Sequence, residues 1–207
     1  MDRSLSDLVQ YLDKQKLLDN TILVVTADHG ESLGEHHLSG HGDSLYVEEI
    51  HVPLILRFPQ SIPAGVRVRT AISQTSLPAT LVELAGGWGE TQMPGLSLSE
   101  LWKDSSAASN WPAPRAELRF RPTRHADRIA LSSIIDFPWH FVKSSNGDDE
   151  LFNLDRDPAE TRNVANLAEY AEVVAKYRLE IESAEPAVVP VAQGRVARMV
   201  YPTRDHP

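Results

Sequence analysis

The chain has 207 residues, of which 42% are hydrophobic and 24% charged, and it carries a net charge of −9 at pH 7. This composition is ordinary for a globular protein of one or two domains, and the acidity argues against a nucleic-acid-binding function, which needs a basic face. No apolar run approaches the roughly 18 residues of a membrane span, and the absence of cysteine excludes disulfide and thiolate chemistry within this chain.

The first half of the chain is predicted to alternate helices with two buried strands of a parallel sheet. Apolar residues at helical spacing predict the helices, and β-branched runs predict the strands. The expected elements are, in order, a helix at 5–18, a strand at 21–27, a polar loop at 30–47, a short helix at 45–50, a strand at 53–58, a strand at 66–72 and a helix at 76–86.

The second half shows a different pattern. After a linker-like segment at 103–114, the sequence predicts strands at 116–121, 128–136, 138–143 and 150–154, followed by a helix at 164–183. Strands in one group with a helix on one face indicate a small α+β unit. We therefore expect an α/β portion at 1–105, an α+β subdomain at 106–184 and an extended tail at 185–207.

The strand at 21–27 ends at Asp28-His29-Gly30, which is the most informative point of the sequence. Open α/β sheets place their ligands at strand ends, and Asp and His are both metal ligands. One Asp and one His hold a metal weakly, so further ligands must come from elsewhere. The alternative interpretation is an Asp that caps a turn beside a surface His.

Around this pair, an ordered series of motifs resembles the sulfatase family of the alkaline-phosphatase-like superfamily. The first group is Asp19-Asn20-Thr21-Ile22, Thr26-Ala27-Asp28-His29-Gly30-Glu31, Leu33-Gly34-Glu35-His36, Gly40-His41-Gly42, Leu45-Tyr46-Val47-Glu48-Glu49 and Val52-Pro53-Leu54-Ile55. The second group is Leu77-Pro78-Ala79-Thr80-Leu81, Leu84-Ala85-Gly86, Pro94-Gly95-Leu96-Ser97-Leu98, Glu150-Leu151-Phe152-Asn153-Leu154, Asp157-Pro158 and Glu160. The resemblance implies the C-terminal part of an alkaline-phosphatase-like sheet, followed by the small α+β subdomain.

The resemblance also implies roles for the loop residues. Asp28 and His29 would ligate a divalent metal, which the family favours as calcium, while the imidazole of His29 raises manganese and zinc as alternatives. His41 would reach the oxygens of a bound sulfate or phosphate, where a hydrogen-bonding donor is needed. Glu31 is expected to orient His29 through its free ring nitrogen, and His36 to order the loop. Because five of the eight histidines lie between 29 and 51, a multi-histidine zinc site is a less favoured alternative.

No nucleophile can be assigned in this chain. The family's signature is Cys or Ser followed by any residue, Pro, any residue and Arg. Two segments share the Pro and Arg, but they hold Phe120 and Val200 at the nucleophile position, and both lie downstream of Asp28. We interpret both as chance matches, and we expect this chain to be inactive alone.

The sequence therefore predicts part of a metal-dependent sulfuric ester hydrolase acting on a sulfate or phosphate ester of a small molecule or glycan. One alternative is a phosphodiesterase or phosphonate monoester hydrolase of the same superfamily. A second is a non-catalytic half-domain that binds a partner chain or a missing N-terminal segment. Residues 1–20 are charged and hold no apolar stretch typical of a signal peptide, so the sequence leaves the compartment, including export of a parent enzyme, undecided.

Overall fold

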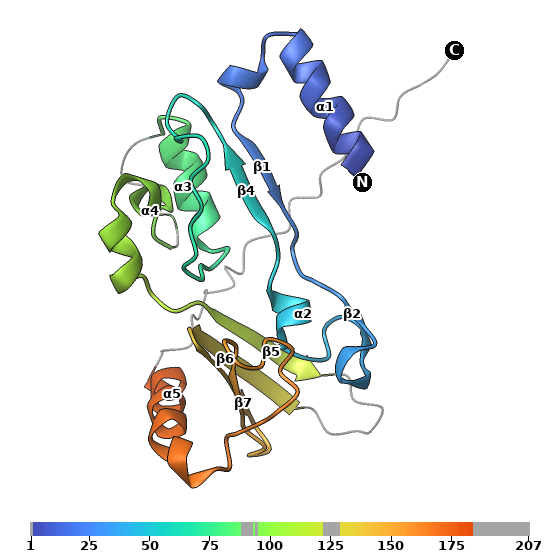
Figure 1. Ribbon diagram of the computed structural model, residues 1–207, viewed down its shortest axis with the longest axis vertical. Coiled ribbons are helices and arrows are strands. Elements are labelled where there is room, and N and C mark those ends of the chain that lie inside the picture. The colour runs from blue at the N-terminus through green and yellow to red at the C-terminus, as the bar shows by residue number, and fades with distance from the viewer. Residues whose placement is uncertain (1, 88–92, 94, 122–128, 184–207) are drawn as a thin grey trace, which may run out of the picture.

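The computed structural model describes residues 2–87, 93, 95–121 and 129–183, so the predicted tail at 185–207 lies outside the described residues. The described strands form a two-stranded sheet of β1 and β4, a two-stranded sheet of β2 and β3, and a four-stranded sheet of β5 to β8. In Figure 1 the β1–β4 sheet lies with helices in the upper part of the molecule, and the sheet that contains β5, β6 and β7 lies beside α5 in the lower part. Both parts mix helices with sheets, which confirms the expected α/β class. Among the described helices, none combines the length and apolar character that crossing a bilayer requires.

The first sheet differs from the expectation of two buried parallel strands. β1 (Leu23–Thr26) pairs antiparallel with β4 (Leu54–Arg57). Within the described ranges these two strands form a sheet of their own, so each has one neighbouring strand, and Ile55 is 60% exposed. The amphipathic helix α1 (Asp2–Lys14) precedes β1 and buries none of its residues.

Between β1 and β4 the chain forms a loop with little regular structure. The loop contains the two-residue strands β2 (Ser32–Leu33) and β3 (Ser39–Gly40), which pair with each other, a 3₁₀ turn at Glu35–His37, and the short helix α2 (Val47–Ile50). The predicted short helix at 45–50 is therefore confirmed. We refer to residues 28–46 as the site loop.

After β4 the structure corrects one prediction and adds one helix. Residues 66–72 form no strand and pair with no strand of the described chain, and Val66 and Val68 are exposed. The helix expected at 76–86 is present as α3 (Ser76–Leu84). A further helix, α4 (Ser99–Lys103), is too short to show a periodic pattern, and a 3₁₀ segment at Ser105–Asn110 occupies the predicted linker.

The second sheet agrees closely with prediction. β5 (Arg115–Arg121), β6 (Ile129–Asp136), β7 (Trp139–Ser144) and β8 (Glu150–Asn153) are joined in chain order by antiparallel pairing. Helix α5 (Ala171–Ser183) begins later than expected, because residues 154–167 form turns before it. Its residues Val174 and Tyr177 pack with Ile134, Phe141 and Leu151 of the sheet in the largest core cluster.

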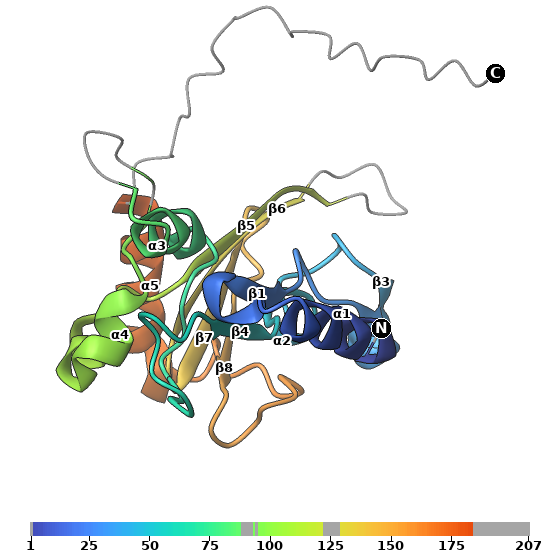
Figure 2. The same cartoon turned by 90° about the horizontal axis from the view of Figure 1, so that it is seen from above.

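The four-stranded sheet is a middle layer between α5 and the site loop. Ile134 and Phe141 face α5, whereas Leu131 and Val142, of opposite parity on the same strands, pack against Leu45 at the end of the site loop. Figure 2 shows this order from above, with α5 on one side of the sheet and α2 on the other. The second sheet therefore supports the loop that follows Asp28.

One ion-pair network joins α3 to α4 and makes stability depend on pH. The Glu83 carboxylate accepts hydrogen bonds from Ser99 Oγ, at 2.7 and 2.9 Å, and from Lys103 Nζ, at 2.8 Å. The hydrogen bond from Lys103 is the main reason why the pKa of Glu83 falls from 4.5 to about 2. A carboxyl group with a lowered native pKa stabilises the fold above its unfolded pKa and loses that contribution as pH falls toward the native value.

We predict that Glu83→Gln lowers the free energy of unfolding at pH 6 and that this deficit shrinks between pH 4.5 and about 2. Urea denaturation of both proteins at pH 6 and pH 3 measures the two differences. Glu100→Gln is the control, because Glu100 is 61% exposed and lies 4.0 Å from the same lysine. A deficit of equal size at both pH values would contradict the prediction.

Candidate metal and anion site

Asp28 and His29 leave the end of β1 with exposed side chains, as the sequence predicts for ligands at a strand end. The Asp28 side chain is 90% exposed, and its Oδ1 accepts the His29 backbone N–H at 3.1 Å. Hydrogen bonds from its own backbone N–H and from that of His29 lower the pKa of Asp28 below its usual value. The carboxylate is therefore ionised and open to a cation.

The His29 ring is held in the tautomer that a metal ligand needs. Nδ1 lies 2.7 Å from the Gly30 carbonyl oxygen, and because a carbonyl only accepts, Nδ1 must carry the proton. This bond is the main reason why the pKa of His29 is raised. Neutral His29 then has its lone pair on Nε2, and a backbone carbonyl on the other ring nitrogen is the usual support of a ligating histidine.

The spacing of the two donor atoms fits a shared ion. His29 Nε2 lies 3.8 Å from Asp28 Oδ2. Two donors about 2.0–2.3 Å from one ion, at bond angles of about 90–120°, are separated by about 3–4 Å. The pair can therefore hold one face of a divalent metal, with the remaining ligands supplied from elsewhere.

The site loop is fixed by one buried carboxylate that the sequence did not single out. Glu49 of α2 is 4% exposed. Its Oε1 accepts from Ser32 Oγ at 3.1 Å and Ser44 Oγ at 2.7 Å, and its Oε2 accepts the Gly42 N–H at 2.7 Å. The Glu49 backbone carbonyl also accepts the Gly30 N–H at 2.7 Å. One residue thus ties together both ends of the loop.

Gly30 explains why the strand end is so close to α2. A Cβ atom at this position would lie 1.9 Å from the Glu48 carbonyl oxygen, which is shorter than any real contact. Only glycine allows the two backbones to approach so closely. The glycine after Asp28 and His29 is therefore required by packing against α2.

His41 lies beside His29, although it comes twelve positions later in the sequence. The two ring centroids are 4.0 Å apart, and His41 Nδ1 lies 3.1 Å from Glu31 Oε2. Donor atoms of His29, Glu31 and His41 all lie within 4.8 Å of one another. The structure therefore pairs Glu31 with His41 rather than with His29, whose Nδ1 meets the Gly30 carbonyl instead.

His36 points away from this group and toward α2. Its ring stacks on Tyr46 with centroids 3.8 Å apart, and its Nε2 lies 3.9 Å from Glu48 Oε2. It has a φ of 51°, in the left-handed region that residues with a side chain rarely adopt. These contacts hold the His36 ring against Tyr46 and Glu48, and the role of His36 in ordering the loop stays a prediction.

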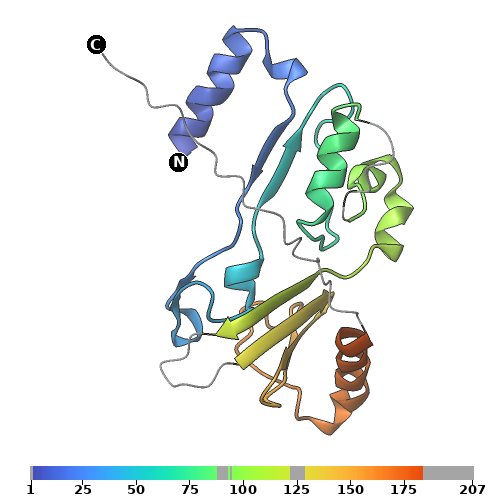
Figure 3. The ribbon, with the colours of Figure 1, turned by 180° about the vertical axis from the view of Figure 1, so that it is seen from behind.

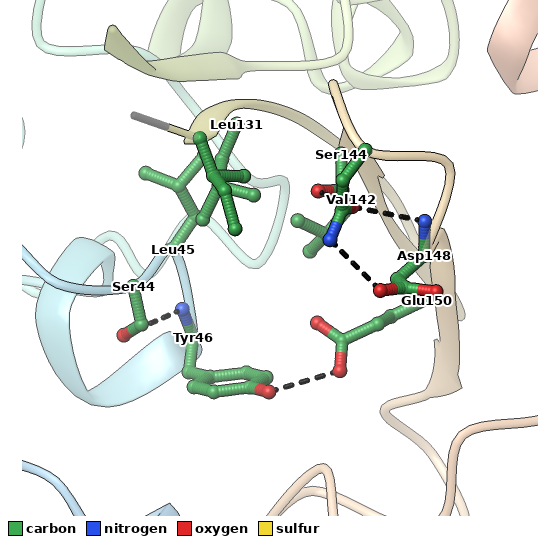
Figure 4. A pocket seen from close by; sticks show the side chains of 10 residues that line it. Ser44, Leu45, Tyr46, Leu131, Val142, Ser144, Asp148 and Glu150 are labelled. Atoms are coloured by element: carbon green, nitrogen blue, oxygen red, sulfur yellow. Dashed lines mark hydrogen bonds between the residues drawn. The ribbon is translucent and has the colours of Figure 1, made fainter. Parts of the chain in front are cut away.

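A cavity of about 150 Å³ is lined jointly by residues 44–46 at the end of the site loop and by residues of the second sheet. Figure 4 shows Leu45 and Leu131 on one wall, with Tyr46 donating to Glu150 Oε1 at 3.0 Å across the opposite side. The described residues that line this cavity do not include Asp28, His29 or His41. Those three side chains are instead exposed on the surface of the described chain.

Comparison with known proteins identifies a family and a fold that this chain resembles. The family model for sulfatases matches residues 1–87. Arylsulfatase K of Xenopus laevis is 31% identical over 170 residues, which cover 79% of this chain and 31% of that relative. This chain therefore spans about a third of the length of the curated relative.

Two solved structures share the fold. One, solved in complex with its substrate D-glucosamine-2-N,6-O-disulfate, is 26% identical with a TM-score of 0.73, over 89% of this chain and 39% of its own. The other, the phosphonate monoester hydrolase of Agrobacterium radiobacter, is 26% identical with a TM-score of 0.74, over 88% of this chain and 38% of its own.

We predict that Glu49→Gln lowers the free energy of unfolding by about 1–3 kcal/mol, because one carboxylate oxygen becomes an NH₂ donor among groups that themselves donate. Urea denaturation at pH 7 measures the loss. Glu172→Gln, the same change at an exposed position of α5, is the control. Equal effects of the two substitutions would show that Glu49 does not hold the loop.

Proposed function

The chain belongs to the sulfatase family through its first 87 residues, and we propose that it supplies a metal-binding and anion-contacting part of a sulfuric ester hydrolase. The observation that carries the proposal is the meeting of Asp28 and His29 at the end of β1 with His41 from the site loop. Members of this family depend on a divalent metal. Asp28, with its carboxylate oxygens, and His29 and His41, with their imidazole nitrogens, are exposed, and divalent metals bind ligand atoms of these types.

In this proposal Asp28 Oδ2 and His29 Nε2 hold the metal, and the Gly30 carbonyl fixes the His29 ring. Calcium is the metal that the family favours, with manganese and zinc as alternatives because His29 contributes an imidazole nitrogen. A bound divalent metal would supply positive charge beside the oxygens of an ester. Glu31, within 4.8 Å of His29 and His41, is a candidate for a third donor.

His41 is the residue that we assign to the substrate. Its Nδ1 is engaged by Glu31, which orients the ring and leaves Nε2 on the opposite side for an oxygen of a sulfate or phosphate group. A donor held in advance at such a position stabilises the negative charge that develops there during ester cleavage. The substrate class is a sulfated small molecule or glycan.

Hydrolysis also needs a nucleophile, and this chain has no cysteine. We therefore propose that the 207 residues alone do not turn over a sulfate ester, and that residues 1–105 act with the rest of a sulfatase domain, carried by a missing N-terminal segment or a partner chain. Residues 106–184 would form the supporting subdomain. The apolar side chains exposed on α1 and β4, Leu8, Tyr11 and Ile55, support such a partner.

The likeness to a phosphonate monoester hydrolase favours one alternative substrate. The same Asp28, His29 and His41 would serve a tetrahedral phosphorus as well as sulfur, so the two activities differ in the rest of the pocket. A non-catalytic half-domain that only binds a partner is the third candidate. Measurements of metal binding and of substrate turnover distinguish these three proposals.

We predict that the chain binds Mn²⁺ and that Asp28→Ala weakens the affinity by more than about tenfold, because a ligand is lost. Isothermal titration calorimetry with Mn²⁺, and then with Ca²⁺, measures the affinity. Asp13→Ala is the matched control, since Asp13 is an exposed aspartate of α1. An unchanged affinity in Asp28→Ala would contradict the assignment of Asp28.

We also predict no turnover of an aryl sulfate or an aryl phosphonate by the pure 207-residue chain with saturating metal. The physical reason is the missing nucleophile. A chromogenic assay over a long incubation tests this. Turnover that disappears in His41→Ala would refute the claim that the chain is inactive alone, and the preferred substrate would then identify the branch.

A further inference from the structure

Glu160 joins the second half of the molecule to the site loop. It follows β8 in the segment Asp157-Pro158-Ala159-Glu160 and is 2% exposed. Its Oε2 accepts the backbone N–H of Val47, the first residue of α2, at 2.8 Å, across 113 residues of sequence. A buried carboxylate of the second unit therefore occupies the N-terminus of the helix that ends the site loop.

The turn that carries Glu160 is built by Asp157. The Asp157 carboxylate accepts the N–H groups of Thr161 at 3.1 Å and Arg162 at 2.8 Å, and also the Thr161 hydroxyl at 2.9 Å. Glu160 itself has a φ of 52°, a conformation that costs free energy for any residue with a side chain. The surrounding hydrogen bonds thus hold Glu160 in a strained backbone that turns its side chain inward.

The other carboxylate oxygen of Glu160 is also hydrogen-bonded. Glu160 Oε1 is hydrogen-bonded to His140 Nδ1 of β7, and both side chains are fully inaccessible to solvent. The carboxylate is therefore fixed between the four-stranded sheet on one side and α2 on the other.

Helix α2 connects Glu160 to both ends of the site loop through hydrogen bonds. The helix that begins at Val47 also carries Glu49, whose carbonyl accepts the N–H of Gly30 and whose carboxylate accepts the N–H of Gly42. Gly30 follows His29 and Gly42 follows His41. A shift of α2 would therefore move the two histidines that share the site.

We propose that Glu160 is a positioning residue, which sets α2 through the Val47 N–H and thereby holds His29 and His41 at the spacing that metal and anion binding require. This inference deepens the proposed function and rests on it for the presence of a metal at Asp28 and His29. The hydrogen bond between Glu160 and Val47 does not depend on any ligand. It gives the Asp157-Pro158…Glu160 motif a role in the site rather than in the stability of the second sheet alone.

The first test is Glu160→Ala. We expect a loss of Mn²⁺ affinity of about 10- to 100-fold, the range found when a group that supports a metal ligand is removed. We also expect faster amide hydrogen exchange at Gly30 and Gly42, while Phe141 and Leu151 in the core of the second sheet exchange as in the wild type. Glu172→Ala, at an exposed position of α5, is the control for both readouts.

The second test removes the other partner of the bond and leaves Glu160 and His140 in place. Val47→Pro deletes the N–H, and proline is well tolerated at the first position of a helix. Tyr46, with φ −68° and ψ 160°, already has the backbone that a residue before proline adopts. We expect the same two effects as in Glu160→Ala. The double variant should show no further loss, because both substitutions break the same hydrogen bond between Val47 and Glu160.

Unchanged exchange at Gly30 and Gly42 in Val47→Pro would overturn the proposal, as would effects of the two variants that add. If Glu160→Ala does not fold, Val47→Pro decides alone. If the wild-type chain binds no Mn²⁺, the proposed function fails, while the exchange measurement still decides whether Glu160 positions the loop. The two failures are therefore distinguishable.

Discussion

The site depends on the buried carboxylate of Glu49. Residues 28–46 contain two strands of only two residues each and one 3₁₀ turn, so regular structure alone does not fix them. Ordering such a segment costs about 1–2 kcal/mol of backbone entropy per residue. Hydrogen bonds from Ser32, Gly42 and Ser44 to a single charged group offset part of that cost and define one conformation of the loop.

The second sheet has a part in the site, although it contributes none of the candidate ligands. One of its faces packs on α5 and the other on Leu45. His140 of β7 and Glu160, in the turn after β8, hold α2 through the Val47 N–H. Figure 3 shows α2 between the β1–β4 sheet and the four-stranded sheet. This position explains how segments more than one hundred residues apart act on one loop.

Local patterns in the sequence predicted most elements but not their partners. The end of β1 just before Asp28, the helix α2 and the four strands of the second sheet follow from apolar periodicity and turn residues. The antiparallel pairing of β1 with β4 joins segments far apart in the sequence, so local patterns do not predict it. The apolar pattern of residues 66–72 predicts a strand, but such a pattern carries no information on whether a partner strand lies beside it. Glu48 and Glu49 are adjacent and identical in type, so sequence alone could not show which one is buried.

The most direct test of the account is where a paramagnetic ion binds. Mn²⁺ titrated into the isotopically labelled chain broadens the NMR signals of nearby nuclei with a steep dependence on distance. The account predicts that broadening is strongest at Asp28 and His29 and extends next to His41. Broadening centred instead on His36, Glu48 and Glu160, whose donor atoms also lie within 4.8 Å of one another, would contradict it.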